Sequence, residues 1–301
     1  MPRVTVAREA GACYGVERAL RLVRETAARS EAPVCTLGPL IHNPRVVAEL
    51  EGRGVRVVET PAEAAGCTLV LRTHGVTPAV EAQARESCAE VVDAACPFVK
   101  KAHLAAERLA RDGYQVVVVG EAGHPEVEAT LAHAVAAGAE ACVVNSATEA
   151  EALPVAKRVG VVVQTTLSRA RLSEVVGALA PRVEDLRVTN TICEATSGHQ
   201  HSCEELARKA DVMVVIGGRN SANTRHLAEI SAEHCPGTHH VEGEDELLPV
   251  WFEGADLIGV TAGASTPAEH IRAVCARIAK LSGATAIERD GDSGTGQESR
   301  P

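Results

Sequence analysis

Three of the ten cysteines occupy equivalent places along the chain. Cys13, Cys96 and Cys193 each follow an extended stretch or a turn and closely precede a helical pattern. The positive end of a helix dipole favours a thiolate over a thiol, and Pro97, directly after Cys96, suits the first turn of a helix. Because convergent thiolates bind soft metals, these cysteines predict a metal site.

Two kinds of soft site fit thiolates of this number, zinc and an iron–sulfur cluster. Structural zinc normally takes a fourth protein ligand and a short Cys-x-x-Cys pair, and no such pair occurs among the ten cysteines. A cubane held by three thiolates leaves one iron open to a substrate. The spacing therefore favours a 4Fe–4S cluster over zinc, with ordinary buried core cysteines as the inert alternative.

Polar turns recur at matching distances after these cysteines. In each case a helical pattern and an apolar strand are followed by a glycine and a polar turn. The marked residues of these first turns, His42, His124 and Ser221, lie 29, 28 and 28 residues after their cysteines. All of these turns precede a helical pattern.

A second polar turn follows in each segment. Its marked residues, His74, Thr166 and Ser265, lie 61, 70 and 72 residues after the cysteines. Agreement at both turns predicts a threefold structural repeat. The expected units are 10–93, 94–190 and 191–282.

The residues in these turns favour an anionic ligand. Open α/β units gather ligands beyond the carboxyl ends of their strands, and helix N-termini bind phosphate through backbone N–H groups. Histidine, serine, threonine and asparagine side chains add donors, which suits a phosphate or a diphosphate. The candidate binding residues are His42, His74, His124, Thr166, Ser221, Ala222, Asn223 and Ser265.

Glu126 is the only carboxylate in this set and lies two residues after His124. Beside a bound anion and a cluster its pKa should rise, which suits a proton donor; the alternative is a first-turn glutamate that stabilises a helix dipole. The catalytic candidates are Glu126, Thr166 and His124. The sequence from His124 to Glu126 also matches half of a zinc deaminase motif, but the Pro-Cys-x-x-Cys half is absent.

Alternating strands and helices must position these residues, which is the pattern of an α/β fold. Apolar residues recur with helical spacing after each cysteine, for example at Val16, Ala19 and Leu20. Three such units around a pseudo-threefold axis would bring the cysteines together. The expected strands are 4–7, 34–37, 68–71, 115–119, 141–144, 159–163, 211–216 and 257–260.

The composition excludes several classes of protein. The chain has 301 residues, a formal net charge of −10 and 2% aromatic residues, which argues against nucleic-acid binding. No apolar run is long enough to cross a bilayer, and the first residues contain no apolar signal core. We expect a cytoplasmic protein that binds neither nucleic acid nor membrane, with a disordered tail at 283–301.

With these residues identified, the sequence over about residues 3–281 resembles the LytB/IspH family of 4-hydroxy-3-methylbut-2-enyl diphosphate reductases. Nine motifs match in the right order, which makes the resemblance specific. They are GACYGVERA (11–19), TLGPLIHNP (36–44), THGV (73–76), DAACP (93–97), GHPEVE (123–128), QTTLS (164–168), TICEAT (191–196), NSANT (220–224) and TAGAS (261–265).

The resemblance implies a trefoil of three α/β units around a 4Fe–4S cluster held by Cys13, Cys96 and Cys193. It implies that Thr166 and Glu126 handle the substrate hydroxyl and its protons. The reaction would be a reductive dehydroxylation that yields isopentenyl and dimethylallyl diphosphate in the non-mevalonate isoprenoid route. Electrons would come from ferredoxin or flavodoxin. The residues implied to bind the diphosphate are His42, His74, His124, Ser221, Asn223 and Ser265.

The sequence departs from the family pattern at several positions. Ala222 stands where the family has a second serine, His199 where it usually has arginine, and Tyr14 where alanine or phenylalanine is common. These departures leave open a paralogue that acts on a related diphosphate. A non-catalytic iron–sulfur protein that binds an anion is a second alternative, and a zinc hydrolase is a third.

Overall fold

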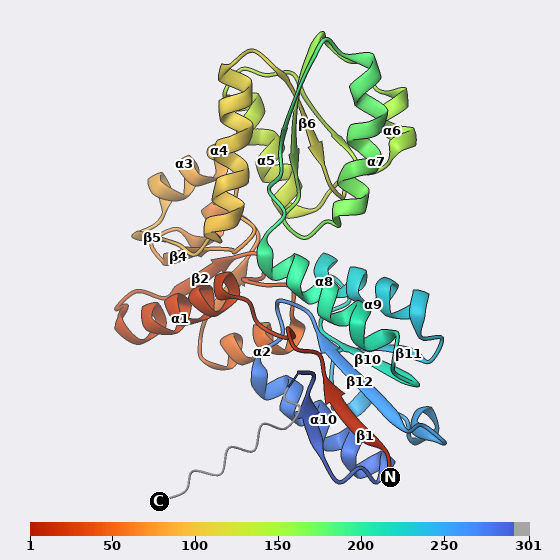
Figure 1. Ribbon diagram of the computed structural model, residues 1–301. Helices are drawn as coiled ribbons and strands as arrows, with labels where there is room; N and C mark the ends of the chain where they lie inside the picture. Colours follow the sequence, from red (N-terminus) through yellow and green to blue (C-terminus); the bar gives the residue numbers. More distant parts are fainter. Residues whose placement is uncertain (292–301) are drawn as a thin grey trace, which may run out of the picture. The chain divides into compact units, whose positions relative to one another are not determined.

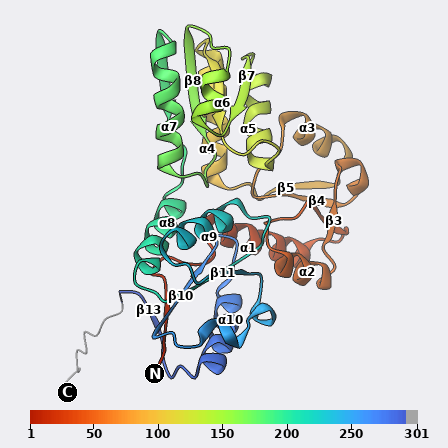
Figure 2. The same cartoon turned by 90° about the vertical axis from the view of Figure 1, so that its right-hand side faces the viewer.

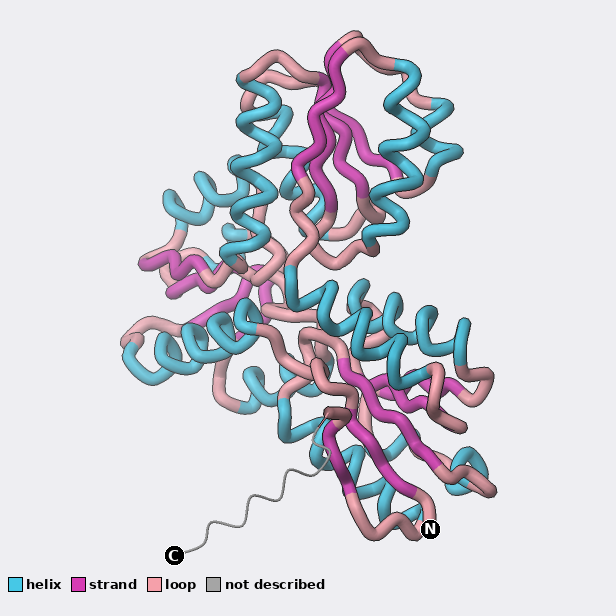
Figure 3. The backbone as a smooth tube through the Cα atoms, viewed as in Figure 1, coloured by secondary structure: helices cyan, strands magenta, loops and turns pink. Residues whose placement is uncertain are grey.

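The computed structural model describes residues 1–291 and contains three parallel β-sheets with helices packed against them (Figures 1 and 3). This confirms the α/β class expected from the alternation of strands and helices. The chain divides into two compact units. One contains Tyr14–Cys193, and the other contains Met1–Cys13 together with the chain from Glu194 onward.

The first sheet of the Tyr14–Cys193 unit has four strands in the order β3-β2-β4-β5. Neighbouring strands are parallel, so the chain must return to the starting edge of the sheet between them. The apolar face of α1, which includes Val16, Ala19 and Leu20, is buried as its spacing predicts. The elements are α1 (Tyr14–Arg29), β2 (Val34–Leu37), α2 (Pro44–Gly52), β3 (Arg56–Val58), the 3-10 helix η1 (Pro61–Ala64), β4 (Thr68–Leu71), α3 (Pro78–Ser87) and β5 (Glu90–Asp93).

The second sheet of this unit also has four parallel strands, in the order β7-β6-β8-β9. Helices α4 and α5 pack on one face of the sheet, and α6 and α7 pack on the other. The interior is almost entirely valine, leucine and alanine. The elements are α4 (Pro97–Arg111), β6 (Gln115–Val119), α5 (Pro125–Ala136), β7 (Ala141–Val144), α6 (Ala147–Ala152), β8 (Arg158–Val163), α7 (Arg169–Leu179), η2 (Ala180–Arg182) and β9 (Asp185–Thr189).

The third sheet is built from both ends of the chain and has the order β11-β10-β12-β1-β13 (Figure 2). Helices α8 and α9 pack on one face, and α10 packs on the other with η3 (Glu244–Glu246) and η4 (Pro249–Phe252). The strand β1 pairs with β12 in parallel, although more than 250 residues separate Val4 from Ile258. The remaining elements are β1 (Arg3–Val6), α8 (Glu194–Ala207), β10 (Val212–Ile216), α9 (Ala222–His234), β11 (Thr238–Val241), β12 (Leu257–Ala262), α10 (Ala268–Ser282) and β13 (Ile287–Arg289).

All three sheets share one topology. The strand order reverses between β2 and β4, between β6 and β8, and between β10 and β12, and ligands bind at such reversal points beyond the carboxyl ends of the strands. The first and second polar turns follow these paired strands. Each cysteine instead follows the next strand in its sheet, which is β5, β9 or β1. The division of the chain into units at 10–93, 94–190 and 191–282 remains a prediction.

All eight expected strands are present, with boundaries shifted by at most two residues. The strands that were not expected are mostly at sheet edges or half-exposed, and β5 and β9 read as charged segments, Glu-Val-Val-Asp and Asp-Leu-Arg-Val-Thr. Such strands lack the continuous apolar run that marks a buried parallel strand. Among residues 1–291, no helix combines the length and apolar character that a membrane span needs.

The expectation of a disordered tail was wrong for its first part. Ile287–Arg289 forms β13 and pairs with Val4–Val6 of β1. Every side chain of this strand is exposed, so hydrophobic periodicity carries no signal for it. The rest of the predicted tail, 292–301, lies outside the described residues.

Leu109 tests the packing of α4 on the second sheet. Its side chain is 2% exposed and covers Gly160 of β8, where an added Cβ would lie 2.8 Å from a Leu109 methyl carbon. We expect Leu109→Ala to lower the free energy of unfolding by about 3 kcal/mol in urea denaturation, through lost burial and a residual cavity. Leu104→Ala on the same helix, where the side chain is 62% exposed, should change it by less than about 0.5 kcal/mol; equal effects would contradict the assigned faces of α4.

Candidate functional site

The first polar turns lie at the N-termini of helices, as their spacing predicts. Asn43 caps α2 by accepting the Arg45 and Val46 N–H groups at 3.1 and 3.3 Å. His124 caps α5, and Ser221 caps α9 by accepting the Thr224 N–H group at 3.3 Å. Helix N-termini carry partial positive charge and N–H donors, so these turns are suited to an anion.

One backbone hydrogen bond is repeated at all three cysteines. The Cys96 N–H group donates to the Thr73 carbonyl at 3.0 Å, and the Cys193 N–H group donates to the Thr165 carbonyl at 3.1 Å. In the other unit, the Cys13 N–H group donates to the Ala264 carbonyl at 3.1 Å. Each acceptor directly precedes the marked residue of a second polar turn. The repeat seen in the spacing is therefore a repeat of backbone geometry.

Three histidines converge in the Tyr14–Cys193 unit. The His42 and His74 rings lie 4.2 Å apart, and each ring lies 5.5 Å from that of His124. One nitrogen from each ring falls within 4.8 Å of the others. They come from the ends of β2, β4 and β6 and so bring together turns from both sheets of this unit. We call this group the histidine cluster.

The surroundings of the histidine cluster favour an anion over a metal ion. His124 Nδ1 accepts the Glu126 N–H group at 3.2 Å, so the ring proton is on Nε2, which is then a donor and not a metal ligand. Burial lowers the pKa of His74 well below its usual value, and the charges of His42, His124 and Arg72 lower it further. A neighbouring arginine also opposes a bound cation and favours a bound anion.

Glu126 is the most strongly perturbed carboxyl group near this cluster. Its side chain is 2% exposed and accepts the Thr165 N–H group at 2.6 Å and the Thr165 hydroxyl at 2.8 Å. Burial raises its pKa to about 7, although the two bonds from Thr165 oppose the rise. A carboxyl group with this pKa exchanges a proton readily at neutral pH. The expected rise is present, with burial as its cause.

The partner of Glu126 is Thr165, whereas the sequence pattern singled out its neighbour Thr166. The Thr166 hydroxyl accepts a hydrogen bond from Gln164 Nε2 at 3.1 Å. Gln164 is buried, and its Oε1 accepts the Glu121 N–H group at 2.9 Å. Pattern analysis missed Thr165 and Gln164 because only one residue per turn was matched across the repeat.

The cysteines Cys96 and Cys193 suit a cationic, sulfur-ligated group. Burial raises the pKa of the Cys96 thiol, and the charges of Cys193 and Glu126 add to the rise, while the N–H groups of Phe98 and Val99 oppose it. The expectation that the helix terminus would favour the thiolate of Cys96 is therefore wrong for the protein alone. Thiols that resist ionisation together lose their protons when a metal group compensates the charge, as sulfur ligation requires.

Asn223 lies in the unit that contains both ends of the chain. Its side chain is 2% exposed, and within residues 1–291 neither its amide nitrogen nor its amide oxygen has a hydrogen-bond partner. The neighbouring Thr224 hydroxyl is also buried without one. Buried polar groups are normally paired, so these groups indicate a polar ligand that approaches the start of α9.

Glycines give the start of α9 its shape. A Cβ at Gly263 would lie 2.0 Å from Thr224 Oγ1, and a Cβ at Gly217 would lie 2.7 Å from the same atom. Both glycines directly follow the central strands β10 and β12. Any side chain there would displace Thr224 and so move Asn223 beside it.

The remaining sequence candidates lie in the same unit as Asn223. Ala222 is the first residue of α9 and is buried, so it contributes a backbone N–H group but no hydroxyl. Ser265 follows β12 in the turn to which the Cys13 N–H group is bonded through Ala264. His199 on α8 is buried, and burial lowers its pKa.

Comparison with known protein families identifies one matching family. The family model described as LytB protein matches residues 4–279. A curated relative from Geobacter sulfurreducens is 48% identical over 91% of this chain and 96% of its own length. A relative from Aquifex aeolicus is 43% identical over 93% of this chain and 97% of its own length. Both are named 4-hydroxy-3-methylbut-2-enyl diphosphate reductase.

Solved structures show the same fold. A structure described as (E)-4-hydroxy-3-methyl-but-2-enyl diphosphate reductase, the terminal enzyme of the non-mevalonate pathway, matches with a TM-score of 0.69 and 43% identity, over 93% of this chain and all of that one. A structure from Plasmodium falciparum matches with a TM-score of 0.88 over 100% of this chain and 96% of that one. At 23% identity, the second likeness concerns the fold alone.

The buried carboxyl group of Glu126 makes stability depend on pH. Because its folded pKa of about 7 exceeds the ordinary value of 4.5, its stabilising contribution is complete below pH 4.5 and is lost as pH rises to about 7. Glu126→Gln cannot ionise, so we expect its free energy of unfolding, relative to the unmodified protein, to rise by about 3 kcal/mol between pH 4.5 and pH 7.5. Urea titrations at both pH values measure this.

The exposed Glu128 on the same helix provides the control, because its carboxylate only accepts the Gly123 N–H group at 3.1 Å. Glu128→Gln should show no such dependence on pH. The same pH profile in both variants would contradict a raised pKa at Glu126.

Proposed function

Because the chain belongs to the LytB family, we propose that it is a 4-hydroxy-3-methylbut-2-enyl diphosphate reductase. The reaction would replace the substrate hydroxyl with hydrogen, with loss of water, and give isopentenyl and dimethylallyl diphosphate. The curated relatives with this name are 43 to 48% identical to the chain over most of its length. The observation that carries the proposal is the hydrogen bond from each cysteine N–H group to the turn of an anion-binding residue, because it ties sulfur ligands and anion donors to the same backbone.

We assign a 4Fe–4S cluster to Cys13, Cys96 and Cys193. When bound, such a cluster supplies Lewis acidity and a path for electrons. The donor set fits, because these cysteines precede equivalent helices and none of the ten cysteines forms a disulfide. Thiolate ligation also suits iron–sulfur chemistry better than the hard cations that oxygen ligands select.

The histidine cluster and the start of α9 would bind the diphosphate. His124 offers an Nε2–H donor, and His42 and His74 lie beside it. In the other unit, Asn223 offers a buried amide that lacks a protein partner, and Ser221 and Ser265 offer hydroxyl groups. Hydrogen bonds to a charged phosphate are stronger than those between neutral groups, so these donors need no lysine.

Glu126 and the turn at Thr165 and Thr166 would serve the proton transfers. The reduction consumes two electrons and two protons and releases one water molecule. A carboxyl group with a pKa of about 7 can give a proton to the departing hydroxyl and regain one from solvent. Thr165 holds the carboxyl group by two hydrogen bonds, while the Thr166 hydroxyl is placed by Gln164 to meet the substrate hydroxyl.

The proposal includes an external electron donor, for which ferredoxin and flavodoxin are the candidates. Both carry single electrons, which a cluster can accept in sequence. Thiolate ligands and an iron–sulfur cofactor also suit the reducing conditions of the cytoplasm. The diphosphate is the only ligand class that we assign, and nucleic acid and membrane are not part of the proposal.

Anaerobic turnover with a reduced one-electron dye tests the proposal. We expect iron and sulfide near four each per chain, from the proposed cluster, and consumption of the hydroxylated diphosphate. Glu126→Gln should keep the iron, the sulfide and the brown colour but lower turnover by about a hundredfold or more. In the unmodified protein, turnover should fall as pH rises above about 7, because Glu126 must be protonated to donate.

Glu128→Gln is again the matched control and should retain turnover. Full activity of Glu126→Gln would favour a non-catalytic iron–sulfur protein. Zinc in place of iron and sulfide would favour a hydrolase.

Ala222 tests whether the missing serine weakens diphosphate binding. Ala222→Ser adds a hydroxyl at the first turn of α9, beside Ser221 and Asn223. One further hydrogen bond to a charged phosphate should lower KM up to about tenfold with little change in kcat. Ala232→Ser on the exposed face of the same helix should leave KM unchanged. An unchanged KM in Ala222→Ser would argue against weakened diphosphate binding at this position.

A further inference from the structure

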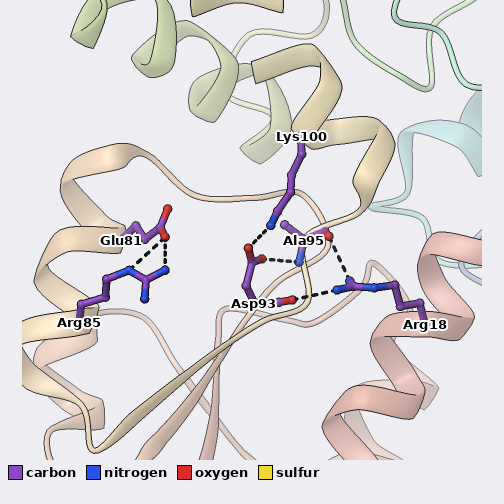
Figure 4. A network of polar contacts seen from close by, with 6 residues as sticks. All are labelled: Arg18, Glu81, Arg85, Asp93, Ala95 and Lys100. Atoms are coloured by element: carbon purple, nitrogen blue, oxygen red, sulfur yellow. Dashed lines mark hydrogen bonds and ion pairs between the residues drawn. The ribbon is translucent and has the colours of Figure 1, made fainter. Parts of the chain in front are cut away.

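The loop at 93–96, which carries Cys96 at its end, is held by side chains from two helices (Figure 4). Asp93, the last residue of β5, accepts the Ala95 N–H group at 2.9 Å through Oδ1. Its other carboxylate oxygen is paired with Lys100 on α4. These contacts fix the chain direction between the strand and α4.

Arg18 on α1 makes the second set of contacts to this loop. Its Nη1 donates to the Ala95 carbonyl at 3.2 Å, and its Nη2 donates to the Asp93 carbonyl at 3.3 Å. The two nitrogens belong to one planar fork, so a single side chain holds carbonyl groups two residues apart, as Figure 4 shows. Ala95 is buried, and its carbonyl needs such a donor.

The clamp acts directly on a sulfur ligand. Ala95 is covalently joined to Cys96, whose own N–H group is bonded to the Thr73 carbonyl. The peptide on the N-terminal side of Cys96 is therefore fixed by Arg18 from one side and by Thr73 from the other. A displacement of either contact would move the Cys96 sulfur.

The same position differs in the other repeats. Arg18 lies five residues after Cys13, and the equivalent residues after Cys96 and Cys193 are Lys101 and Gly198. The Lys101 ammonium lies over the Phe98 ring at 5.0 Å, and glycine has no side chain. Neither residue offers a forked donor, so this clamp is particular to the Cys96 loop within the described repeats.

We propose that Arg18 is a positioning residue for Cys96 and that its guanidinium favours the reduced state of the cluster proposed above. The second part rests on the proposed function. A fixed positive charge two bonds' reach from the ligand loop stabilises added negative charge, as occurs when an electron enters the cluster. The first part concerns the protein alone.

Arg18→Met tests both parts, because methionine keeps much of the side-chain length but donates no hydrogen bond and carries no charge. In the full-length protein, we expect amide hydrogen exchange at residues 95–99 to quicken about tenfold. In the anaerobically reconstituted protein, the ratio of reduced to oxidised cluster at a fixed potential should fall about tenfold. For a one-electron couple that is a shift of about 59 mV to more negative potential.

Arg21→Met is the matched control, because Arg21 lies on the same helix and is exposed, with Glu25 of that helix as its partner at 3.5 Å. It should leave both measurements unchanged. Arg18→Lys keeps the charge but loses the fork. It should restore the potential and leave exchange faster than in the unmodified protein.

The outcomes separate this inference from the proposed function. Exchange at residues 95–99 that is the same in Arg18→Met and Arg21→Met would overturn the positioning role. Faster exchange with an unchanged potential, in protein that holds a cluster and turns over, would overturn the role toward the cluster. If the unmodified protein binds no iron and sulfide, the reductase proposal fails, while the exchange result still decides whether Arg18 holds the Cys96 loop.

Discussion

One backbone contact recurs at the centre of this structure: the N–H group of a cysteine donates to the carbonyl of the residue before an anion-binding side chain. It occurs at Cys13, Cys96 and Cys193, each time between the end of one strand and the end of its neighbour in a parallel sheet. Because parallel strands end at the same edge, this contact fixes the metal ligand and the anion donor of one repeat to a common support. The helices that follow then supply their N-termini to that same edge.

Chemical tuning in this protein comes from burial more than from neighbouring charge. Glu126 lies in the interior with one protein partner, Thr165, and the loss of solvent outweighs the two hydrogen bonds in setting its pKa. His74 is shifted in the opposite direction by the same cause, since burial penalises whichever form carries the charge. A carboxyl group that keeps its proton beside imidazoles that stay neutral lets an arriving diphosphate bring the dominant charge.

Much of the fold and of the site could be predicted from the sequence, because both are repeated. The valine-rich strands β6 and β8 and the apolar face of α1 have clear periodicity, and the polar turns recur at fixed distances from the cysteines. Strands β5 and β9 could not be found this way, since half of their side chains are polar, yet they place Cys96 and Cys193. Contacts such as that between Glu126 and Thr165 join residues 39 positions apart and depend on tertiary packing, which spacing does not encode.

The place of β1 in the third sheet has a consequence for how the protein is made. The first strand to leave the ribosome pairs with β12 and β13, which are among the last segments to be synthesised. Until then β1 and the loop to Cys13 have no sheet to join, whereas the two sheets of Tyr14–Cys193 have all their strands as soon as that segment is complete. Completion of the third sheet is thus a post-translational closure between the ends of the nascent chain, and a premature stop before β12 would strand the first cysteine with no partner strand for β1.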